Sequence, residues 1–315
     1  MSETIESLRR KIDKANDLQS VVRTMKALAA SSIVQYEKSV SALSDYYRTV
    51  ELGLEICFRE ISPSGHAERT RKKSAGFTGA VVFGSDQGLV GQFNDVVADY
   101  AVKKLAALPG KPQVWAVGER VYSRLADAGL PVIGLFTVPN SVKAITPLVG
   151  QILVESEKLR NQDEDAGLYL FYNHHKTRAT YEPFSQRLLP LDEKWISELS
   201  KHPWQTGNLP EVVGNNVTTL EALIREYIFV SLFRACAESL ASENASRLVA
   251  MQRADKNIEE MLEDLNGKFY RLRQIGIDEE LFEVISGFEA LLRSRSPGHR
   301  RDDDKFRIIR GEREK

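Results

Sequence analysis

A hydrophobic seam through residues 3–57 constrains the fold more than any other feature, because this segment has no proline and only one glycine, Gly53. Counting from Ile5 in alternating steps of three and four residues reaches fifteen positions, of which thirteen are apolar when Ala and Tyr are included. These positions are Ile5, Leu8, Ile12, Ala15, Gln19, Val22, Lys26, Ala29, Ile33, Tyr36, Val40, Leu43, Tyr47, Val50 and Leu54. Such a period, held over seven heptads, predicts a left-handed coiled coil. At about 1.5 Å per residue, the helix would be about 80 Å long.

A second long helix is predicted over residues 217–292, which contain no proline. Thr218 or Thr219 can cap its start. Its apolar ladder skips Arg234, Asn244 and Asp255 and otherwise holds Leu220, Leu223, Tyr227, Val230, Ala237, Ala241, Leu248, Met251, Ile258, Leu262, Leu265, Phe269 and Leu272. Because each seam needs a partner, we expect the two terminal helices to pair with each other as an antiparallel coiled coil.

The residues between the two helices alternate strand and helix patterns. Strands are predicted at 79–83, 114–117, 131–136 and 168–172, and helices at 95–108, 120–128 and 141–159. This alternation predicts an open α/β sheet. The expected fold class is therefore α+β, with a small open α/β (Rossmann-like) domain at 76–195 inserted between coiled-coil helices at 1–57 and 217–292. Loops are predicted at 58–78 and 196–216, and a flexible polar tail at 293–315.

The charge balance argues against a dedicated nucleic-acid binder, which would carry a basic excess. Lys and Arg number 43 against 44 Asp and Glu, a formal net charge of −1. The charge is unevenly placed, since residues 217–292 carry eight basic and fourteen acidic groups, whereas residues 293–315 carry nine basic and five acidic groups. This uneven distribution points to protein partners.

The number of cysteines and the hydropathy of the chain limit the cellular compartments in which the protein is expected. Cys57 and Cys236 are too few for a disulfide scaffold and indicate a reducing, cytoplasmic environment. No apolar run approaches the ~20 residues that span a bilayer, and the first residues lack the pattern of a secretory signal. We therefore expect no direct membrane span, so that other chains would hold the protein at any membrane.

The segment Gly84–Asn94 is the candidate for nucleotide chemistry, because it joins a predicted strand to a predicted helix. Its glycines follow the spacing G-x-x-x-G-x-x-G rather than G-x-G-x-x-G, and no acidic residue stands about 20 residues further on, where a ribose partner belongs. A tight strand-to-helix turn is the competing interpretation.

Other motifs for catalysis or metal binding are weak. His174 and His175 are adjacent on a strand and point to opposite faces, which disfavours a shared metal and favours exposed or edge histidines. Paired carboxylates such as Glu259–Glu260 fit a solvated or partner-facing helix. These patterns therefore predict a protein with no catalytic residue, no metal and no cofactor. A long coiled coil that carries a small α/β domain and no such site is expected to act as a lever, shaft or spacer.

The chain resembles the γ subunit family of F-type ATP synthases over nearly its whole length, to about residue 292, and four blocks of residues carry the resemblance. The first is Leu8–Ile12 with Gln19 and Met25–Ala30, and the second is Ser85–Asn94, similar to the family's SDRGLCGGFN. The third is Tyr172–Asn173 with Leu188–Leu191, which the resemblance places in the sheet. The fourth and most specific block is Glu238–Met251, followed by Asn257, Arg273–Gln274, Ile277, Glu280–Leu281, Glu283 and Gly287.

The resemblance implies a central rotor shaft that has no catalytic site of its own. The two long helices would lie inside a ring of three α and three β subunits, and the α/β domain would form a foot on the c-ring beside the ε subunit. Ion flow would turn the c-ring, and the shaft would carry the torque to the catalytic head. The protein would be peripheral, on the cytoplasmic side of a bacterial membrane.

The resemblance also implies roles for individual residues. Met25, Lys26 and Arg247 would lie near an acidic segment of β, and Arg273 and Gln274 would face a β loop. Ile277, Leu281, Ile285 and Phe288 would sit in an apolar sleeve of the head, although a core role under Ile5 and Leu8 is the alternative. The foot-domain turn would consist of Asp86, Gly88, Gly91 and Asn94.

The chain departs from the family pattern at Gln87, Val90 and Gln92, where the family has Arg, Cys and Gly, which puts the role of this loop in question. Two other hypotheses stay open. One is a free-standing coiled-coil scaffold with a degenerate α/β head, and the other is a nucleotide-binding enzyme centred on Gly84–Asn94.

Overall fold

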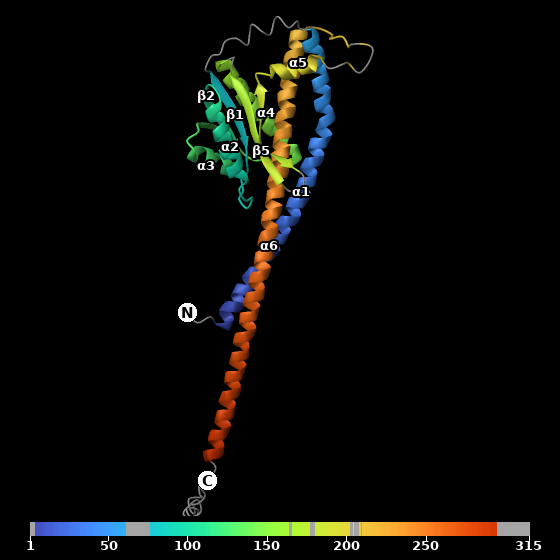
Figure 1. The fold of residues 1–315 in the computed structure, drawn as a ribbon. Helices are drawn as coiled ribbons and strands as arrows, with labels where there is room; N and C mark the ends of the chain where they lie inside the picture. The colour runs from blue at the N-terminus through green and yellow to red at the C-terminus, as the bar shows by residue number, and fades with distance from the viewer. Residues whose placement is uncertain are drawn as a thin grey trace, which may run out of the picture. The chain divides into compact units, whose positions relative to one another are not determined.

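The computed structural model describes residues 4–60, 76–163, 166–176, 180–201, 204, 208 and 210–294. The elements run in the order α1 (Ile5–Glu60), β1 (Phe77–Phe83), α2 (Phe93–Ala107), β2 (Lys111–Val117), α3 (Glu119–Asp127), β3 (Val132–Phe136), α4 (Val142–Gln162), β4 (Gly167–Lys176), β5 (Thr180–Leu189), α5 (Glu193–Lys201) and α6 (Asn216–Ser294) (Figure 1). They form two compact units, an end unit (Met1–Gln19 with Asn257–Lys315) and a central unit (Ser20–Lys256). Most of the predicted loop at 58–78, and the predicted tail beyond Ser294, lie outside the described residues.

The two long helices match the predicted helical ends of the chain, since α1 has 56 residues and α6 has 79. Their seam is narrower than predicted. On α1 the buried positions Leu8, Ala15, Val22, Ala29, Tyr36 and Val50 follow a seven-residue spacing in which one position, Leu43, is only half-buried. Positions between them, such as Ile12 and Ile33, are only half-buried, and Ile5 is exposed. One side of the predicted seam is therefore buried more completely than the other.

Within the central unit, contacts between α1 and α6 establish an antiparallel pair. Arg23 and Lys26 of α1 bind Asp255, and the Tyr47 ring lies 6.0 Å from that of Tyr227. Further along α1, a Cβ built on Gly53 would approach Leu223 Cδ2 to 3.0 Å. As α1 advances, its partners run backward along α6, so the predicted pairing of the two chain ends is confirmed here.

The central sheet has the order β3-β2-β1-β4-β5. Neighbouring strands are parallel from β3 to β4, and β5 pairs antiparallel with β4. The strand pattern had not identified β5, which the resemblance placed only in part through Leu188–Leu191. The prediction of a loop at 196–216 was wrong for its first turns, because α5 lies there and packs Trp195, Ile196 and Leu199 against the core.

Both faces of the sheet are covered. On one face Val82, Ala116 and Phe171 pack with residues of α2 and α3. On the other, Val81, Trp115 and Leu170 pack with residues of α4, α1 and α6, including Ile145, Leu54 and Leu232. Figure 1 shows α2 and α3 on the side of the sheet away from α6. The α/β region thus completes one of its two cores with the long helices.

Candidate functional site at the carboxyl edge of the sheet

The carboxyl ends of β1 and β4 mark the place where a doubly wound sheet normally holds a ligand. β1 lies between β2 and β4 and is parallel to both, so the chain leaves it in one direction for β2 and reaches β4 on the other side. Ligands of such sheets bind in the crevice at this switch of direction. Two parts of the chain border that crevice: the segment that follows β1, and Asn173 near the end of β4.

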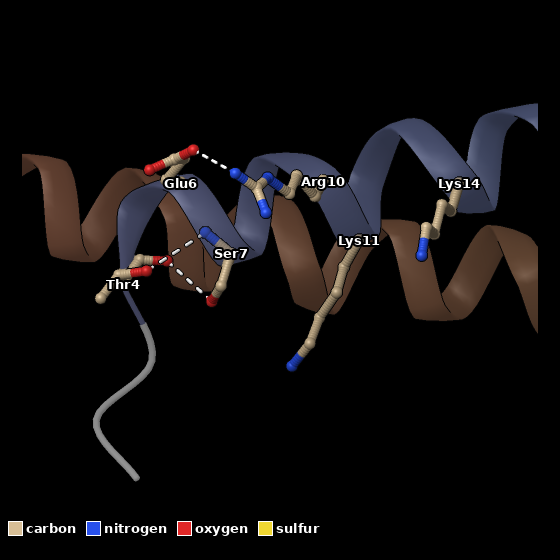
Figure 2. Close-up of a pocket in the computed structure, with 6 residues that line it drawn as sticks. All are labelled: Thr4, Glu6, Ser7, Arg10, Lys11 and Lys14. Atoms are coloured by element: carbon tan, nitrogen blue, oxygen red, sulfur yellow. Dashed lines mark hydrogen bonds and ion pairs between the residues drawn. The ribbon is translucent and has the colours of Figure 1, made fainter.

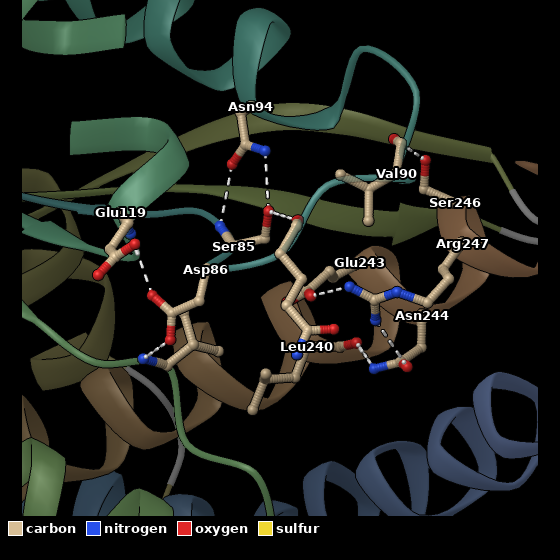
Figure 3. Close-up of polar contacts among 12 residues, drawn as sticks. Ser85, Asp86, Val90, Asn94, Glu119, Leu240, Glu243, Asn244, Ser246 and Arg247 are labelled. Carbon is tan, nitrogen blue, oxygen red and sulfur yellow. Dashed lines mark hydrogen bonds and ion pairs between the residues drawn. The ribbon is translucent and has the colours of Figure 1, made fainter. Parts of the chain in front are cut away.

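Side chains of the segment after β1 bind one another and the adjacent backbone (Figure 3). The backbone N–H of Ser85 donates to Asn94 Oδ1 at 2.9 Å, and Asn94 Nδ2 donates to Ser85 Oγ at 2.8 Å. The Asp86 carboxylate accepts the backbone N–H of Glu119 at 3.0 Å and that of Val138 at 2.9 Å. Asp86 and Asn94 therefore build a turn that ties β1 to α2, to α3 and to the segment after β3.

At two positions of this turn, glycine is required for steric or conformational reasons. A Cβ on Gly84 would lie 2.4 Å from Val121 Cβ, so only glycine lets β1 approach α3 this closely. Gly91 has a φ of 59°, in the left-handed region that disfavours side chains with a Cβ. At Gly88 a Cβ would meet only Arg120, at 3.8 Å, so its predicted importance has no steric basis in this chain alone.

The crevice itself is filled by α6. Ser242 Oγ donates to the backbone carbonyl of Asn173 at 2.8 Å, and Ser246 Oγ donates to that of Val90 at 2.5 Å. Every residue from Ala235 to Ser246 is buried. A surface helix would keep one polar face in water, so this stretch of α6 is enclosed on all sides.

A buried ion pair continues this polar segment. Arg247 Nη2 lies 2.5 Å from Glu243 Oε1, and Arg247 Nη1 donates to Asn244 Oδ1 at 3.2 Å (Figure 3). Burial raises the pKa of the Glu243 carboxyl, the Arg247 charge opposes that rise, and nearby Asp86 adds to it. Among the described residues, Glu243 Oε2 and Arg247 Nε have no hydrogen-bond partner.

One turn before Ser242, the Glu238 carboxylate joins α6 to β4. Glu238 Oε2 lies 2.7 Å from His174 Nδ1, and Glu238 Oε1 accepts a hydrogen bond from Arg234 Nε at 2.7 Å. Burial and the neighbouring Glu238 carboxylate raise the pKa of Tyr172. The His174 side chain is 38% exposed and lies beyond the part of β4 that pairs with β1, which fits the prediction of an exposed or edge histidine, although Glu238 holds the imidazole. The side chain of His175 lies outside the described residues.

The residues expected to contact other subunits fall into two groups. Lys26 and Arg247 are already engaged within the chain, Lys26 with Asp255 at 2.8 Å, and Met25 is half-buried. Arg273 and Gln274 are exposed. The apolar residues that follow are exposed too, with exposed fractions between 46% and 68% for Ile277, Leu281, Phe282, Ile285 and Phe288. The alternative that Ile5 and Leu8 bury these apolar residues is therefore wrong.

The first turn of α1 borders a small hollow of about 270 Å³ lined by Thr4, Glu6, Ser7, Arg10, Lys11 and Lys14 (Figure 2). Thr4 caps this turn, since the backbone N–H of Ser7 donates to Thr4 Oγ1 at 3.2 Å. Arg10 pairs with Glu6 at 2.5 Å. The local hydrogen bonds are those of an ordinary helix start.

The described part of the chain contains no group of three or more His, Cys, Asp or Glu side chains that could hold a metal ion. None of its described helices combines the length and the hydropathy needed to cross a bilayer.

Comparison with known proteins gives a consistent result. A family model described as ATP synthase matches residues 4–291. The chain is 24% identical over 289 residues to the ATP synthase gamma chain of Dechloromonas aromatica (strain RCB) and 26% identical over 294 residues to that of Cupriavidus necator, covering in both cases 91% of this chain and 99% of the relative.

Solved structures show the same fold. A chain from the OSCP/F1/c-ring part of the Euglena gracilis mitochondrial ATP synthase has a TM-score of 0.65 and 17% identity, with 95% of this chain and 98% of that one covered. A chain from the central stalk and c-ring of the Tetrahymena thermophila mitochondrial ATP synthase has a TM-score of 0.52 and 21% identity, with 74% and 99% covered.

Proposed function

This chain belongs to the ATP synthase gamma-chain family, and from that premise we propose that it is the central-stalk rotor subunit of an F-type ATP synthase or ATPase. It transmits torque between an ion-driven c-ring in the membrane and a catalytic head of three α and three β subunits. The observation in the structure that carries this proposal is the exposed apolar end of α6. A large apolar surface left in water by the isolated chain marks a contact with another protein.

The head contact is proposed for the residues that the family pattern names. Ile277, Leu281, Ile285 and Phe288 occupy an apolar sleeve, where full burial of each stabilises the complex by about 1.5–3 kcal/mol. Arg273 and Gln274, exposed one turn earlier, face a loop of β. Met25, Lys26 and Arg247 lie near an acidic segment of β. For Lys26 and Arg247 this contact competes with Asp255 and Glu243 of the same chain.

The proposed foot is the α/β region at 76–195, between coiled-coil helices at 1–57 and 217–292, with Asp86, Gly88, Gly91 and Asn94 in its turn. It rests on the c-ring beside the ε subunit. The protein is then peripheral, on the cytoplasmic side of a bacterial membrane. Its attachment depends on the c-ring, so removal of the c-ring should release it from membranes.

We propose further that the chain has no catalytic site of its own. Support comes from the carboxyl edge of the sheet, where α6 fills the crevice and Ser85, Asp86 and Asn94 bind one another or the backbone. Titration of the isolated chain with ATP and NAD tests this. Micromolar affinity for either nucleotide would restore the hypothesis of an enzyme centred on Gly84–Asn94.

Co-expression with α and β subunits tests the rotor function. We expect a stable complex of three α, three β and one γ chain, with ATPase activity that depends on the γ chain. The hypothesis of a free-standing scaffold predicts that no such complex forms, or that the ATPase activity is the same when this chain is omitted.

A further inference from the structure

We propose that α6 serves as the built-in ligand of the α/β region, fastened by Glu238, Ser242 and Ser246, and that this fastening is the joint through which the sheet turns the long helices. These three side chains are called the joint stripe below. The inference rests on the proposed rotor function, because it names the residues that carry torque from the foot into α6.

The joint stripe is defined by its spacing. Its members are four residues apart, so they lie on one face of α6 over two successive turns. Glu238 binds His174 of β4, Ser242 donates to the carbonyl of Asn173 on β4, and Ser246 donates to the carbonyl of Val90 after β1. The face of α6 that meets the crevice is thus attached at three successive points.

The two carbonyl acceptors are themselves held at a fixed spacing. Asn173 Nδ2 donates to the carbonyl of Phe93 at 2.9 Å, which ties β4 to the first residue of α2. Val90, which accepts from Ser246, lies three residues earlier in the chain and is linked to Phe93 by a backbone hydrogen bond. The acceptors therefore belong to one braced unit rather than to two independent segments.

Attachment at several points along the axis matters for torque. A single hydrogen bond would let a helix pivot about the contact, whereas points spaced along the axis on two segments of the sheet resist both sliding and rotation. Ser242 and Asn173 are fully buried, so water cannot replace the bonds while the joint is under load. Ala237, Ala241 and Ala245 of the same stretch are buried as well, and small side chains let the neighbouring surfaces approach α6 closely.

The test uses the assembled head complex with this chain at full length. The head is fixed to a surface, and a bead is attached to the foot through a cysteine at exposed Lys103 (Lys103→Cys); the native cysteines are buried and do not compete for the label. The readouts are ATP-driven rotation and the torsional stiffness, taken from angular fluctuations of the paused bead. Thermal stability of the isolated chain is measured in parallel.

The test variant is Ser242→Ala with Ser246→Ala. The matched control is Ser231→Ala, which removes another buried hydroxyl of α6 that has no hydrogen-bond partner among the described residues. Since two of three parallel attachments are removed, we expect the stiffness to fall by about twofold or more while the control matches wild type. Wild-type stiffness in the double variant would overturn the joint, even if its melting temperature falls.

A covalent replacement provides the second arm. A Cβ on Gly91 would lie 3.8 Å from Ser246 Oγ, close enough for a disulfide between Gly91→Cys and Ser246→Cys. Because the left-handed backbone at Gly91 strains any side chain, the reduced form of the same double variant is the reference. If the joint stays closed during turnover, oxidation should leave rotation running and raise the stiffness above the reduced value. Rotation that stops on oxidation and resumes on reduction would show that the joint moves, and the proposal would be wrong.

This second arm also decides the matter if the double alanine variant fails to assemble. Failure of the rotor function is distinguishable, because a wild-type bead would then not rotate at all. Failure of the joint alone leaves wild-type rotation intact and both variants at wild-type stiffness.

Discussion

Asp255 of α6 illustrates how single residues set the pairing of the two long helices. It stands at a position where the apolar ladder breaks, and its carboxylate receives Lys26 Nζ at 2.8 Å and Arg23 Nε at 3.3 Å. Lys26 likewise interrupts the apolar seam of α1. The two polar interruptions therefore face each other, and a shifted pairing would place each opposite apolar residues. This is how polar seam positions fix register in coiled coils.

Replacing Asp255→Asn should remove a pH-dependent part of the stability. The hydrogen bond and the charge of Lys26, and then those of Arg23, hold the pKa of Asp255 below its usual value of 3.8. Because the folded-state pKa is the lower one, the contribution is complete above the unfolded pKa and is lost as pH falls through the folded pKa. The melting temperature of the variant should lie below wild type at pH 7, and the gap should begin to close below about pH 4 and disappear below the lowered folded-state pKa. Glu279→Gln, also on α6, is the control, and a gap independent of pH would contradict this account.

Asp86 gives a second prediction at the level of one side chain. Its carboxylate accepts two backbone N–H groups, and charged acceptors of this kind are worth about 1.5–3 kcal/mol per bond. Because water replaces part of this at a half-buried site, Asp86→Ala should lower the free energy of unfolding by about 2 kcal/mol. Urea denaturation measures the change, with Asp99→Ala on the exposed face of α2 as control. Equal losses in the two variants would show that the Asp86 contacts do not hold the turn.

At the scale of elements, the packing of β1 against α3 depends on Gly84. An alanine there would place Cβ 2.4 Å from Val121 Cβ and 2.7 Å from Asn94 Oδ1. We expect Gly84→Ala to destabilise the protein by about 1–3 kcal/mol, as overpacking does elsewhere. In Gly150→Ala on α4 the new methyl meets nothing within 4 Å, so the same change should stabilise by about 0.5–1 kcal/mol. Thermal unfolding of both variants tests the pair, and effects of the same sign would contradict the steric argument.

The sequence predicts an element well where a hydrophobic pattern repeats over many residues, and poorly where contacts with other elements determine the structure. Both terminal helices follow from their apolar ladders, and β1, β2 and β4 from short apolar runs. β5 was missed because Pro183 and several polar residues break its pattern. It lies at the edge of the sheet and pairs only with β4, where a proline is tolerated. α5 was missed because nine residues hold too few turns for a clear period.

Only one half of the candidate site could be predicted from the sequence. The strand-glycine-helix pattern located Ser85, Asp86 and Asn94, because both sides of the turn lie in one stretch of sequence. Ser242 and Ser246 were missed as functional residues, since a serine on a helix indicates no particular partner. One signal was present: between Ala235 and Ser246 the helix has only two charged residues, too few for a solvated face. Only the fold shows that this stretch enters the crevice.

At the scale of the whole molecule, two regions reverse the usual distribution of side chains. Around Glu238–Ser246 of the central unit, polar groups are buried, and Glu238, Ser242 and Ser246 among them bind β4 or the segment after β1. In the end unit, the last turns of α6 hold large apolar residues that are exposed, including Phe282 at 68% and Phe288 at 63%. Folding of the chain alone explains the first reversal through hydrogen bonds. It does not explain the second, which is consistent with a surface that is buried only on assembly.

Replacing Leu281→Gln together with Phe288→Gln separates these two roles. Because both side chains are more than half exposed, the isolated chain should keep its melting temperature. In the complex with α and β subunits, two buried apolar contacts of about 1.5–3 kcal/mol each would be lost, so the complex should dissociate at dilutions where wild type stays intact. Mass photometry across a dilution series measures this, with Glu279→Gln as the control at a neighbouring exposed site. A lower melting temperature of the isolated variant would place these residues in the core, and unchanged dissociation would remove them from the head contact.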